Sequence, residues 1–295
     1  MKTGKRYPLQ QSLLFKLKSR KKLADLFGMA YKALMGLSED NSNFRIFTIE
    51  KNEKYREVQV PKPILEQVHK RLFKLLQRIE TPKYLHSGIK KKSHITNAKT
   101  HEKGSALVKL DIKKYYPSTK REAVYQFFRG YLCCSPDVSK VLTDLSCVNG
   151  HISTGSPLSQ ILAFFASLPM FEKIDKLSSS NQITFTVYVD DLTFSAETVP
   201  GEFIWQVKKL IHGHGYEYHK EFSSPPDKTK LVTGVAIDGG CLKVQNKHHQ
   251  AIHSLYVQHL EGMLRREDRA RLVGMLSSAS QVSARYNSIF RHVLK

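Results

Sequence analysis

Two adjacent acids lie inside the most strand-prone segment of the chain, and they restrict its fold more than any other feature. In ITFTVYVDDLTFSAE (183–197), β-branched and aromatic residues flank Asp190 and Asp191 on both sides. This pattern predicts a β-hairpin with strands at 183–189 and 192–196. Both carboxylates would lie at its tip, where they can face solvent or a metal ion. A plain turn is the alternative, because aspartate favours turns through its own hydrogen bonds.

The remainder of the chain is strongly basic. Its 295 residues include 47 lysines and arginines against 26 acids, which gives a formal net charge of +21. Such a surplus favours a polyanionic partner, either nucleic acid or an anionic membrane. No apolar run reaches membrane-spanning length, and the leucine-rich segment 12–27 is broken by lysines, so it predicts an amphipathic helix. We therefore expect a nucleic-acid partner and no membrane.

The cysteines and histidines give little direction. None of the 4 cysteines has the spacing of zinc ligands, and the 13 histidines are scattered along the chain. We expect the cysteines to be free thiols, as is usual in a reducing cytoplasm.

A third acid favours a metal site over a plain turn at the aspartate pair. Asp111 ends the predicted strand ALVKLDI (106–112). A strand-end aspartate beside a hairpin-tip pair is an arrangement that holds two divalent cations through oxygen ligands. Two such ions about 4 Å apart stabilise the attacking and leaving oxygens of a phosphoryl transfer. The sequence therefore predicts a site for two Mg²⁺ ions, which explains why a basic chain places like charges side by side.

The predicted elements follow an α+β order. A helical start over 1–43 precedes a β-hairpin over 44–63 and an amphipathic helix over 64–79. Further helices are predicted at 121–132, 156–177, 201–215 and 246–295, strands at 106–112 and 230–237, and a basic loop at 86–104. This order predicts helices on one face of a small antiparallel sheet.

The acids and their surroundings resemble a known active site. YVDD (188–191), with LDIKKYYP (110–117) upstream, is similar to the palm of reverse transcriptases. RIFTIEK and REVQVPKP resemble the fingers hairpin of these enzymes, TGSPLSQ their Gly-Ser-Pro block, and LVTG their last palm strand. NAKTH (97–101) and VTG (232–234) resemble two motifs that mark bacterial retron reverse transcriptases. The similarity extends from about residue 44 to about residue 290.

The resemblance implies a right-hand polymerase fold of the α+β class. An RRM-like antiparallel palm sheet backed by helices would lie between fingers and a helical thumb. We expect N-terminal helices and fingers over 1–105, the palm over 106–238 and the thumb over 239–295, with a fingers-like helical insert at about 121–150. The segment after residue 237 is expected to hold no RNase H, integrase, maturase or endonuclease domain.

The same resemblance implies roles for individual side chains. Asp111 and Asp190 would ligate both Mg²⁺ ions, with Asp191 as an accessory ligand. Tyr116 would be the steric gate that excludes the ribonucleotide 2′-OH. Lys220 would protonate the leaving pyrophosphate, with Lys228 as a competing candidate. The residues expected to bind the incoming dNTP are Lys51, Arg56, Tyr116, Gly155, Ser156, Pro157 and Lys220. The residues expected to contact RNA are Asn97, His101, Val232, Thr233 and Gly234.

The implied function is RNA-directed DNA polymerisation. The chain would copy its own structured noncoding RNA into a branched RNA–DNA molecule, msDNA, in the bacterial cytoplasm. Its partners would be this RNA, the cDNA product, dNTPs and a separate effector protein in anti-phage defence. Thr154 departs from the family pattern, because many relatives have Gln there. It favours the alternative of a ribonucleoprotein scaffold with incidental polymerase activity, and another type of bacterial reverse transcriptase is the remaining alternative.

Overall fold

The chain folds into two compact units. The structure, a computed structural model, describes residues 6–294 except 41, 52 and 227, and describes only the backbone of Lys51 and Lys54. The first unit comprises Met1–Lys83, Ile112–Lys176 and Trp205–His219, and the second comprises Tyr84–Asp111, Leu177–Ile204 and Lys220–Lys295. Each unit is therefore assembled from three separate stretches of sequence.

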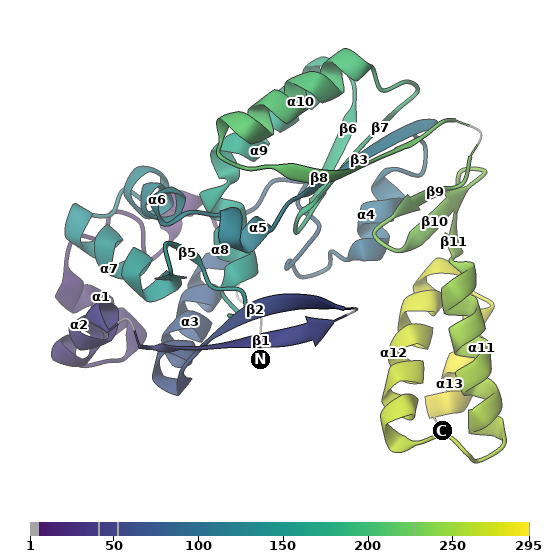
Figure 1. The fold of residues 1–295 in the computed structure, drawn as a ribbon, viewed down its shortest axis with the longest axis horizontal. Helices are drawn as coiled ribbons and strands as arrows, with labels where there is room; N and C mark the ends of the chain where they lie inside the picture. The colour runs from purple at the N-terminus through teal and green to yellow at the C-terminus, as the bar shows by residue number, and fades with distance from the viewer. Residues whose placement is uncertain (1–5, 41, 52, 227, 295) are drawn as a thin grey trace. The chain divides into compact units, whose positions relative to one another are not determined.

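The first unit consists mainly of helices (Figure 1). They are α1 (Arg20–Phe27), α2 (Tyr31–Glu39), α3 (Pro63–Leu76), α5 (Tyr115–Ser118), α6 (Arg121–Gln126), α7 (Pro136–Ser146) and α8 (Ser159–Ala166). The predicted hairpin is present as antiparallel strands β1 (Phe44–Lys51) and β2 (Lys54–Pro61). A second, short hairpin pairs β4 (Cys147–Val148) with β5 (His151–Ile152). Aromatic side chains fill the core, where the rings of Phe127 and Phe165 stack with centroids 5.0 Å apart.

The second unit contains a four-stranded sheet with the order β6–β7–β3–β8. Its strands are β3 (Ala106–Ile112), β6 (Thr184–Tyr188), β7 (Asp191–Ala196) and β8 (Tyr218–Ser224), and β7 runs antiparallel to both β3 and β6. Helices α9 (Leu168–Ser180) and α10 (Gly201–Gly213) pass from one unit to the other. This mixture of helices and an antiparallel sheet confirms the predicted α+β class.

The rest of the second unit follows β8 in sequence, apart from α4 (His94–Thr100). Strands β9 (Lys230–Val232), β10 (Val235–Asp238) and β11 (Cys241–Val244) form a three-stranded sheet. Helices α11 (Asn246–Leu260), α12 (Arg266–Val282) and α13 (Tyr286–Leu294) then form a bundle (Figure 1). Leu272, Leu276 and Tyr286 are among the buried side chains at its centre. No helix in the described part of the chain is long and apolar enough to span a bilayer.

The two faces of the four-stranded sheet carry different side chains, because neighbouring residues on a strand point to opposite faces. One face is aromatic: Phe185 and Phe194 stack with centroids 5.1 Å apart, and Phe203 of α10 meets Phe194 edge-on. The opposite face carries Ser195 near one end of β7 and Asp191 at the other. Asp111 and Asp191 therefore lie on the face opposite the aromatic packing.

Several predicted element boundaries were wrong. Segment 12–27, predicted as one amphipathic helix, is helical only from Arg20, and Leu13 is 57% exposed. The helix predicted at 156–177 begins later, at Ser159, and is split between α8 and α9. Pro169, which has no backbone N–H to donate, lies just after this break.

Local pattern missed several elements, among them α4 and β8, and it merged two others. The predicted basic loop 86–104 contains α4, and the polar segment 218–224 forms edge strand β8. The strand predicted at 230–237 is the hairpin β9–β10, which turns at Thr233 and Gly234. Because this turn has only two residues, the sequence pattern shows one continuous strand instead of two.

Candidate functional site

The three predicted acids gather at one end of the four-stranded sheet. Asp111 of β3 and Asp191 of β7 are direct partners in the antiparallel register, so their side chains leave the same face. Asp190 lies in the two-residue turn that joins β6 to β7, beside the pair formed by Tyr188 and Asp191. Asp190 thus occupies the hairpin tip as predicted, whereas Asp191 begins the second strand.

The turn that carries Asp190 is held in an unusual conformation. Val189 has φ = 61°, a left-handed value that is rare for a β-branched residue. Its backbone N–H donates to Ser87 Oγ at 2.9 Å. The chain just before Ser87 pairs with β6 through Leu85 and Val187. The segment 84–87 therefore braces the turn from outside, and strain of this kind concentrates at functional sites.

Two lysines supply positive charge next to the acids. Lys220 of β8 places Nζ 3.4 Å from Asp111 Oδ2. Lys109, two residues before Asp111 on β3, lies with Nζ 5.0 Å from the ring centroid of Phe222. Burial lowers the pKa of Lys109, while the charges of Asp191 and Asp111 oppose that shift. Both lysines therefore offset part of the negative charge.

Asp190 and Asp191 resist ionisation. Burial, reinforced by the charges of Asp111 and Asp191, raises the pKa of Asp190 to about 6. Burial, followed by the charge of Asp111, also raises the pKa of Asp191. Like charges opposite each other on neighbouring strands destabilise a sheet, so this cluster needs positive charge from lysines or from cations.

The donor set is suited to Mg²⁺, although the side chains are not arranged as a finished metal site. Within the described residues, no three acid, histidine or cysteine side chains converge closely enough to hold an ion. Three carboxylates nevertheless provide the hard oxygen ligands that Mg²⁺ prefers. Asp111, Asp190 and Asp191 are therefore the residues that would hold such ions.

The residues predicted to bind the dNTP belong mostly to the first unit. Tyr116 is half-buried on α5, and its neighbour Tyr115 is 4% exposed, as expected if Tyr115 serves the core. Arg56 is exposed on β2, and the side chain of Lys51 lies outside the described part of the structure. Pro157 is exposed in the loop before α8. The acids and Lys220 belong to the second unit.

Gly155 has a packing role that the sequence did not reveal. A Cβ at this position would lie 2.8 Å from Val60 Cγ2 and 2.9 Å from the carbonyl oxygen of Gln59. The backbone N–H of Gly155 donates to that carbonyl at 3.0 Å. The close approach that Gly155 permits in this structure is to β2. Only glycine fits there without displacing the strand.

Thr154 docks onto the same strand. Its Oγ1 accepts the N–H of Gln59 at 3.1 Å and donates to the Glu57 carbonyl at 3.2 Å. The threonine that departs from the family pattern therefore joins the Gly-Ser-Pro block to β2, and its short side chain suits this contact.

His69 is a residue of this region that the sequence reading missed. It is fully buried on α3, where Nε2 lies 2.6 Å from the Leu145 carbonyl and Nδ1 lies 2.6 Å from Ser156 Oγ. A carbonyl only accepts, so Nε2 carries the proton and Nδ1 accepts from the serine hydroxyl. Burial lowers the pKa of His69 to about 4, which keeps the ring neutral. Its position in the apolar face of a helix gave no sequence signal of this contact.

The two motifs expected to contact RNA instead pack against each other. Asn97, His101 and Val232 are each 0% exposed, so their side chains present no surface to RNA in this structure. Asn97 Nδ2 lies 3.5 Å from Thr233 Oγ1, which in turn donates to the His94 carbonyl at 2.8 Å. We call these contacts between α4 and the β9–β10 turn the motif joint.

Hydrophobic packing and a second polar contact complete the surroundings of the motif joint. Ile95 and Ala98 of α4 share a buried cluster with Leu107, Val232, Val235 and Ile237. His101 bridges two strands of the large sheet, with Nδ1 2.6 Å from Ser195 Oγ and Nε2 2.7 Å from Thr186 Oγ1. In this structure Asn97, His101 and Val232 pack inside the second unit, and their RNA contacts remain a prediction.

Thr233 is strained by its place in the motif joint. It has φ = 44° and is followed by Gly234 at φ = 87°. Two successive positive φ values are typical of the tightest hairpin turn, which favours Asn-Gly. A threonine here is unfavourable for the backbone, but its hydroxyl supplies the hydrogen bond to α4. Thr233 and Gly234 remain partly exposed, unlike Asn97, His101 and Val232.

Comparison with known proteins identifies relatives for this combination of acids and motifs. No family model matches the chain. It is 26% identical to the retron Se72 reverse transcriptase of Salmonella heidelberg (strain 579083-10) over 266 residues, 84% of this chain and 69% of that protein. The chain is a homologue of retron reverse transcriptases. This confirms the resemblance that YVDD, NAKTH and VTG predicted.

Two further relatives of this retron homologue come from Escherichia coli. The retron Ec86 reverse transcriptase is 23% identical and is matched over 75% of this chain and 74% of its own length. The retron Ec83 reverse transcriptase is 24% identical, with 83% and 85% covered.

A solved structure supports the fold of the retron homologue. A foamy viral protease–reverse transcriptase, in complex with double-stranded DNA, matches with a TM-score of 0.51 at 14% sequence identity. The match covers 85% of this chain but only 38% of the viral chain. The shared architecture is therefore that of a reverse transcriptase, over less than half of the viral protein.

Proposed function

We propose that the chain is an RNA-directed DNA polymerase of the retron type, which copies a structured noncoding RNA into branched RNA–DNA. The observation that carries this proposal is the direct pairing of Asp111 and Asp191 across β3 and β7, with Asp190 in the adjoining turn. The homology to retron reverse transcriptases and the net charge of +21 support it. By the same resemblance, a separate effector protein would act with the chain in anti-phage defence.

The acids would form the catalytic centre. Two Mg²⁺ ions held by Asp111, Asp190 and Asp191 would activate the primer hydroxyl and neutralise charge on the dNTP phosphates. The brace from Ser87 to Val189 would keep Asp190 aimed at that centre. Because this contact already fixes the turn, little reorganisation would be needed when substrate binds.

Lys220 is the better candidate for the proton donor to pyrophosphate. It lies on β8 beside Asp111. Lys228 instead lines a hollow with Gly104 and Ser105, which precede β3 at its opposite end from Asp111. A general acid must reach the leaving group at the reacting centre, so position favours Lys220.

The remaining predicted residues would bind the incoming nucleotide. Tyr116 would exclude ribonucleotides, while Lys51 and Arg56 of the β1–β2 hairpin would hold the triphosphate. Gly155, Ser156 and Pro157 would line the nucleotide site through the block that β2 and His69 hold in place.

The first experiment is DNA synthesis by an Asp190→Asn variant. Incorporation of radiolabelled dNTP on a primed RNA template with Mg²⁺ should fall below about 1% of wild type, because a catalytic carboxylate is lost. Asp238→Asn, which removes a partly exposed acid of β10, is the matched control and should retain activity. Wild-type rates in Asp190→Asn would refute the catalytic assignment.

A second experiment tests the retron product. The chain is expressed with its native flanking DNA, and the nucleic acid that copurifies is digested separately with RNase and DNase. The wild type should retain a small DNA joined to RNA, and Asp190→Asn should retain the RNA alone. If neither protein carries DNA and both carry the same RNA, the scaffold alternative is favoured.

The contacts of Thr154 weaken the main sequence argument for that scaffold. Thr154 was the one feature that suggested lost polymerase function. Its two hydrogen bonds to β2 give it a structural reason to differ from Gln.

A further inference from the structure

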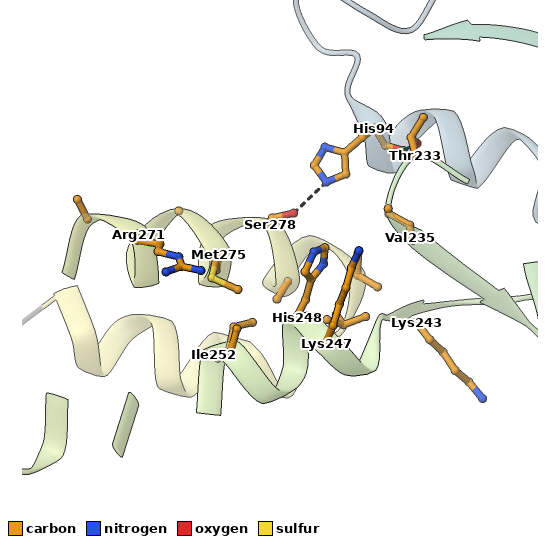
Figure 2. A pocket seen from close by; sticks show the side chains of 17 residues that line it. His94, Thr233, Val235, Lys243, Lys247, His248, Ile252, Arg271, Met275 and Ser278 are labelled. Atoms are coloured by element: carbon orange, nitrogen blue, oxygen red, sulfur yellow. Dashed lines mark hydrogen bonds between the residues drawn. The ribbon is translucent and has the colours of Figure 1, made fainter. Parts of the chain in front are cut away.

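A cavity of about 720 Å³ lies next to the motif joint (Figure 2). It is bounded by α4, the β9–β10 turn and helices α11 and α12, all within the second unit. This volume is in the range of small-ligand sites. Its wall is largely apolar, with contributions from Val235, Ile252, Met275, Ala279 and Val282.

The charged residues around the cavity are all basic. Lys247 and His248 of α11 point from their helix toward the space beneath Ser278 in Figure 2, and Arg271 lies on α12. Lys243 also borders the cavity, but it points away and pairs with Asp238 at 2.5 Å. None of the lining residues is an acid, and no described residue forms an ion pair with Lys247 or Arg271. The cavity is therefore complementary to an anion with an apolar body.

The wall on the side of α4 is rigid. His94 Nε2 lies 3.0 Å from Ser278 Oγ, which ties α4 to α12. Thr233 and Gly234 form another edge and are fixed by the motif joint. Buried Asn97 thus supports the edge formed by Thr233 without lining the cavity itself.

We propose that this cavity binds one unpaired nucleotide of the structured RNA, with the base on the apolar wall and the phosphate near Lys247, His248 and Arg271. The proposal rests on the proposed function, because that function supplies the RNA. A paired base is not available to such a pocket, whereas unpaired bases of loops and bulges are read by burial against side chains. The site would select RNA by the position of an unpaired nucleotide relative to its helices.

Filling the cavity provides the first test. Gly274 of α12 lines the cavity, and a Cβ there would have no atom within 4 Å. Gly274→Leu therefore projects into the cavity while favouring the helix. Gly36→Leu in α2 is the matched control, since Gly36 is also helical, exposed and open at Cβ. The probe is the RNA that copurifies with full-length wild-type chain, extracted, end-labelled and rebound.

We expect Gly274→Leu to weaken binding of this RNA at least about tenfold, and Gly36→Leu to stay within about twofold of wild type. Removal of charge should act at the same place. Lys247→Gln with Arg271→Gln should weaken binding more than Arg265→Gln with Arg266→Gln, which removes the same charge outside the cavity. Irradiation at 254 nm followed by mass spectrometry should place a nucleotide adduct on the cavity segments of α11 or α12.

Several results would overturn the proposal that the cavity binds RNA. Binding within twofold for Gly274→Leu, or adducts only outside the cavity, would overturn the proposal. If UMP, CMP, AMP or GMP blocks adduct formation while Gly274→Leu leaves RNA affinity unchanged, the cavity serves a free nucleotide and the RNA proposal is wrong. Wild-type chain that retains no RNA also refutes it.

The proposed polymerase is tested separately by wild-type dNTP incorporation on primed poly(rA). If wild type synthesises DNA on this template and Gly274→Leu binds the RNA as well as wild type does, only the cavity proposal is refuted. Tight RNA binding that depends on Gly274, without any DNA synthesis, would remove the polymerase alone.

Discussion

His69 shows how one neutral ring can set the geometry of the Gly-Ser-Pro block. Its proton lies on Nε2 toward the Leu145 carbonyl, which leaves Nδ1 to accept from Ser156. Ser156 Oγ also accepts the N–H of Leu158 at 3.1 Å, at the entrance to α8. A single tautomer of a buried histidine therefore aligns α3, the Gly-Ser-Pro block and α8.

We predict that His69 acts on the nucleotide through Ser156. Ser156→Ala and His69→Phe should each raise KM for dNTP several-fold, since both release the block. The double variant should be little worse than either single one, with a coupling of about 1 kcal/mol. Steady-state kinetics of the three proteins provide the measurement. Additive effects on KM would show that His69 contributes only to folding.

The motif joint is the corresponding feature at the scale of elements. Thr233 holds the N-terminal turn of α4 through the His94 carbonyl, at the cost of a left-handed backbone. Thr233→Val keeps the shape of the side chain but removes the hydroxyl, and it should lower the free energy of unfolding by about 1–3 kcal/mol.

Thr233→Ser keeps the hydroxyl and relieves the β-branched side chain, so it should stay within about 1 kcal/mol of wild type. Urea unfolding of the three proteins measures both differences. Equal stability of the valine and serine variants would show that the hydrogen bond to α4 contributes nothing.

The elements also show what the sequence could and could not predict. Alternating residues around Asp190 and Asp191 were sufficient to predict the hairpin, and Asp111 lies at the predicted strand end. Helix α4 was missed because only Ile95 and Ala98 of its residues are apolar and buried. The sequence did hold a local signal, the capping box at the start of α4. There the Ser93 side chain accepts the N–H of Thr96, and the Thr96 side chain accepts the N–H of Ser93.

Contacts between distant segments had no local signal. Asn97 and Thr233 are 136 residues apart in sequence. The sequence predicted an RNA contact for each of their motifs and did not predict that the motifs contact each other. The turn at Thr233 was missed because threonine disfavours positive φ. Edge strand β8 is mostly exposed and polar, so it lacks the hydrophobic alternation that marks a half-buried strand.

For the whole molecule, buried histidines should couple folding to pH. Burial lowers the pKa of His101 to about 3, compared with about 6.5 when the chain is unfolded. Between these values the unfolded chain binds a proton that the folded chain does not, so stability decreases as pH falls. His69 acts in the same sense, whereas the raised pKa of Asp190 acts in the opposite sense.

The prediction is therefore made for a difference between proteins. From pH 6.5 to pH 5, the free energy of unfolding of wild type should fall by about 2 kcal/mol more than that of His101→Gln. His69 and Asp190 are present in both proteins, so their contributions drop out of this difference. Urea unfolding at pH 7, 6 and 5 provides the values. Parallel pH profiles would mean that His101 is not buried in its neutral form.

The motif joint also limits how this protein can be recombined with its relatives. A chimera that takes residues 230–295 from another retron reverse transcriptase would bring a foreign turn against the resident α4. Exchange of 93–101 in the same step would keep Asn97, the His94 carbonyl and Thr233 as a matched set. Transplanted RNA specificity should therefore require two segments that lie far apart in the gene to be moved together.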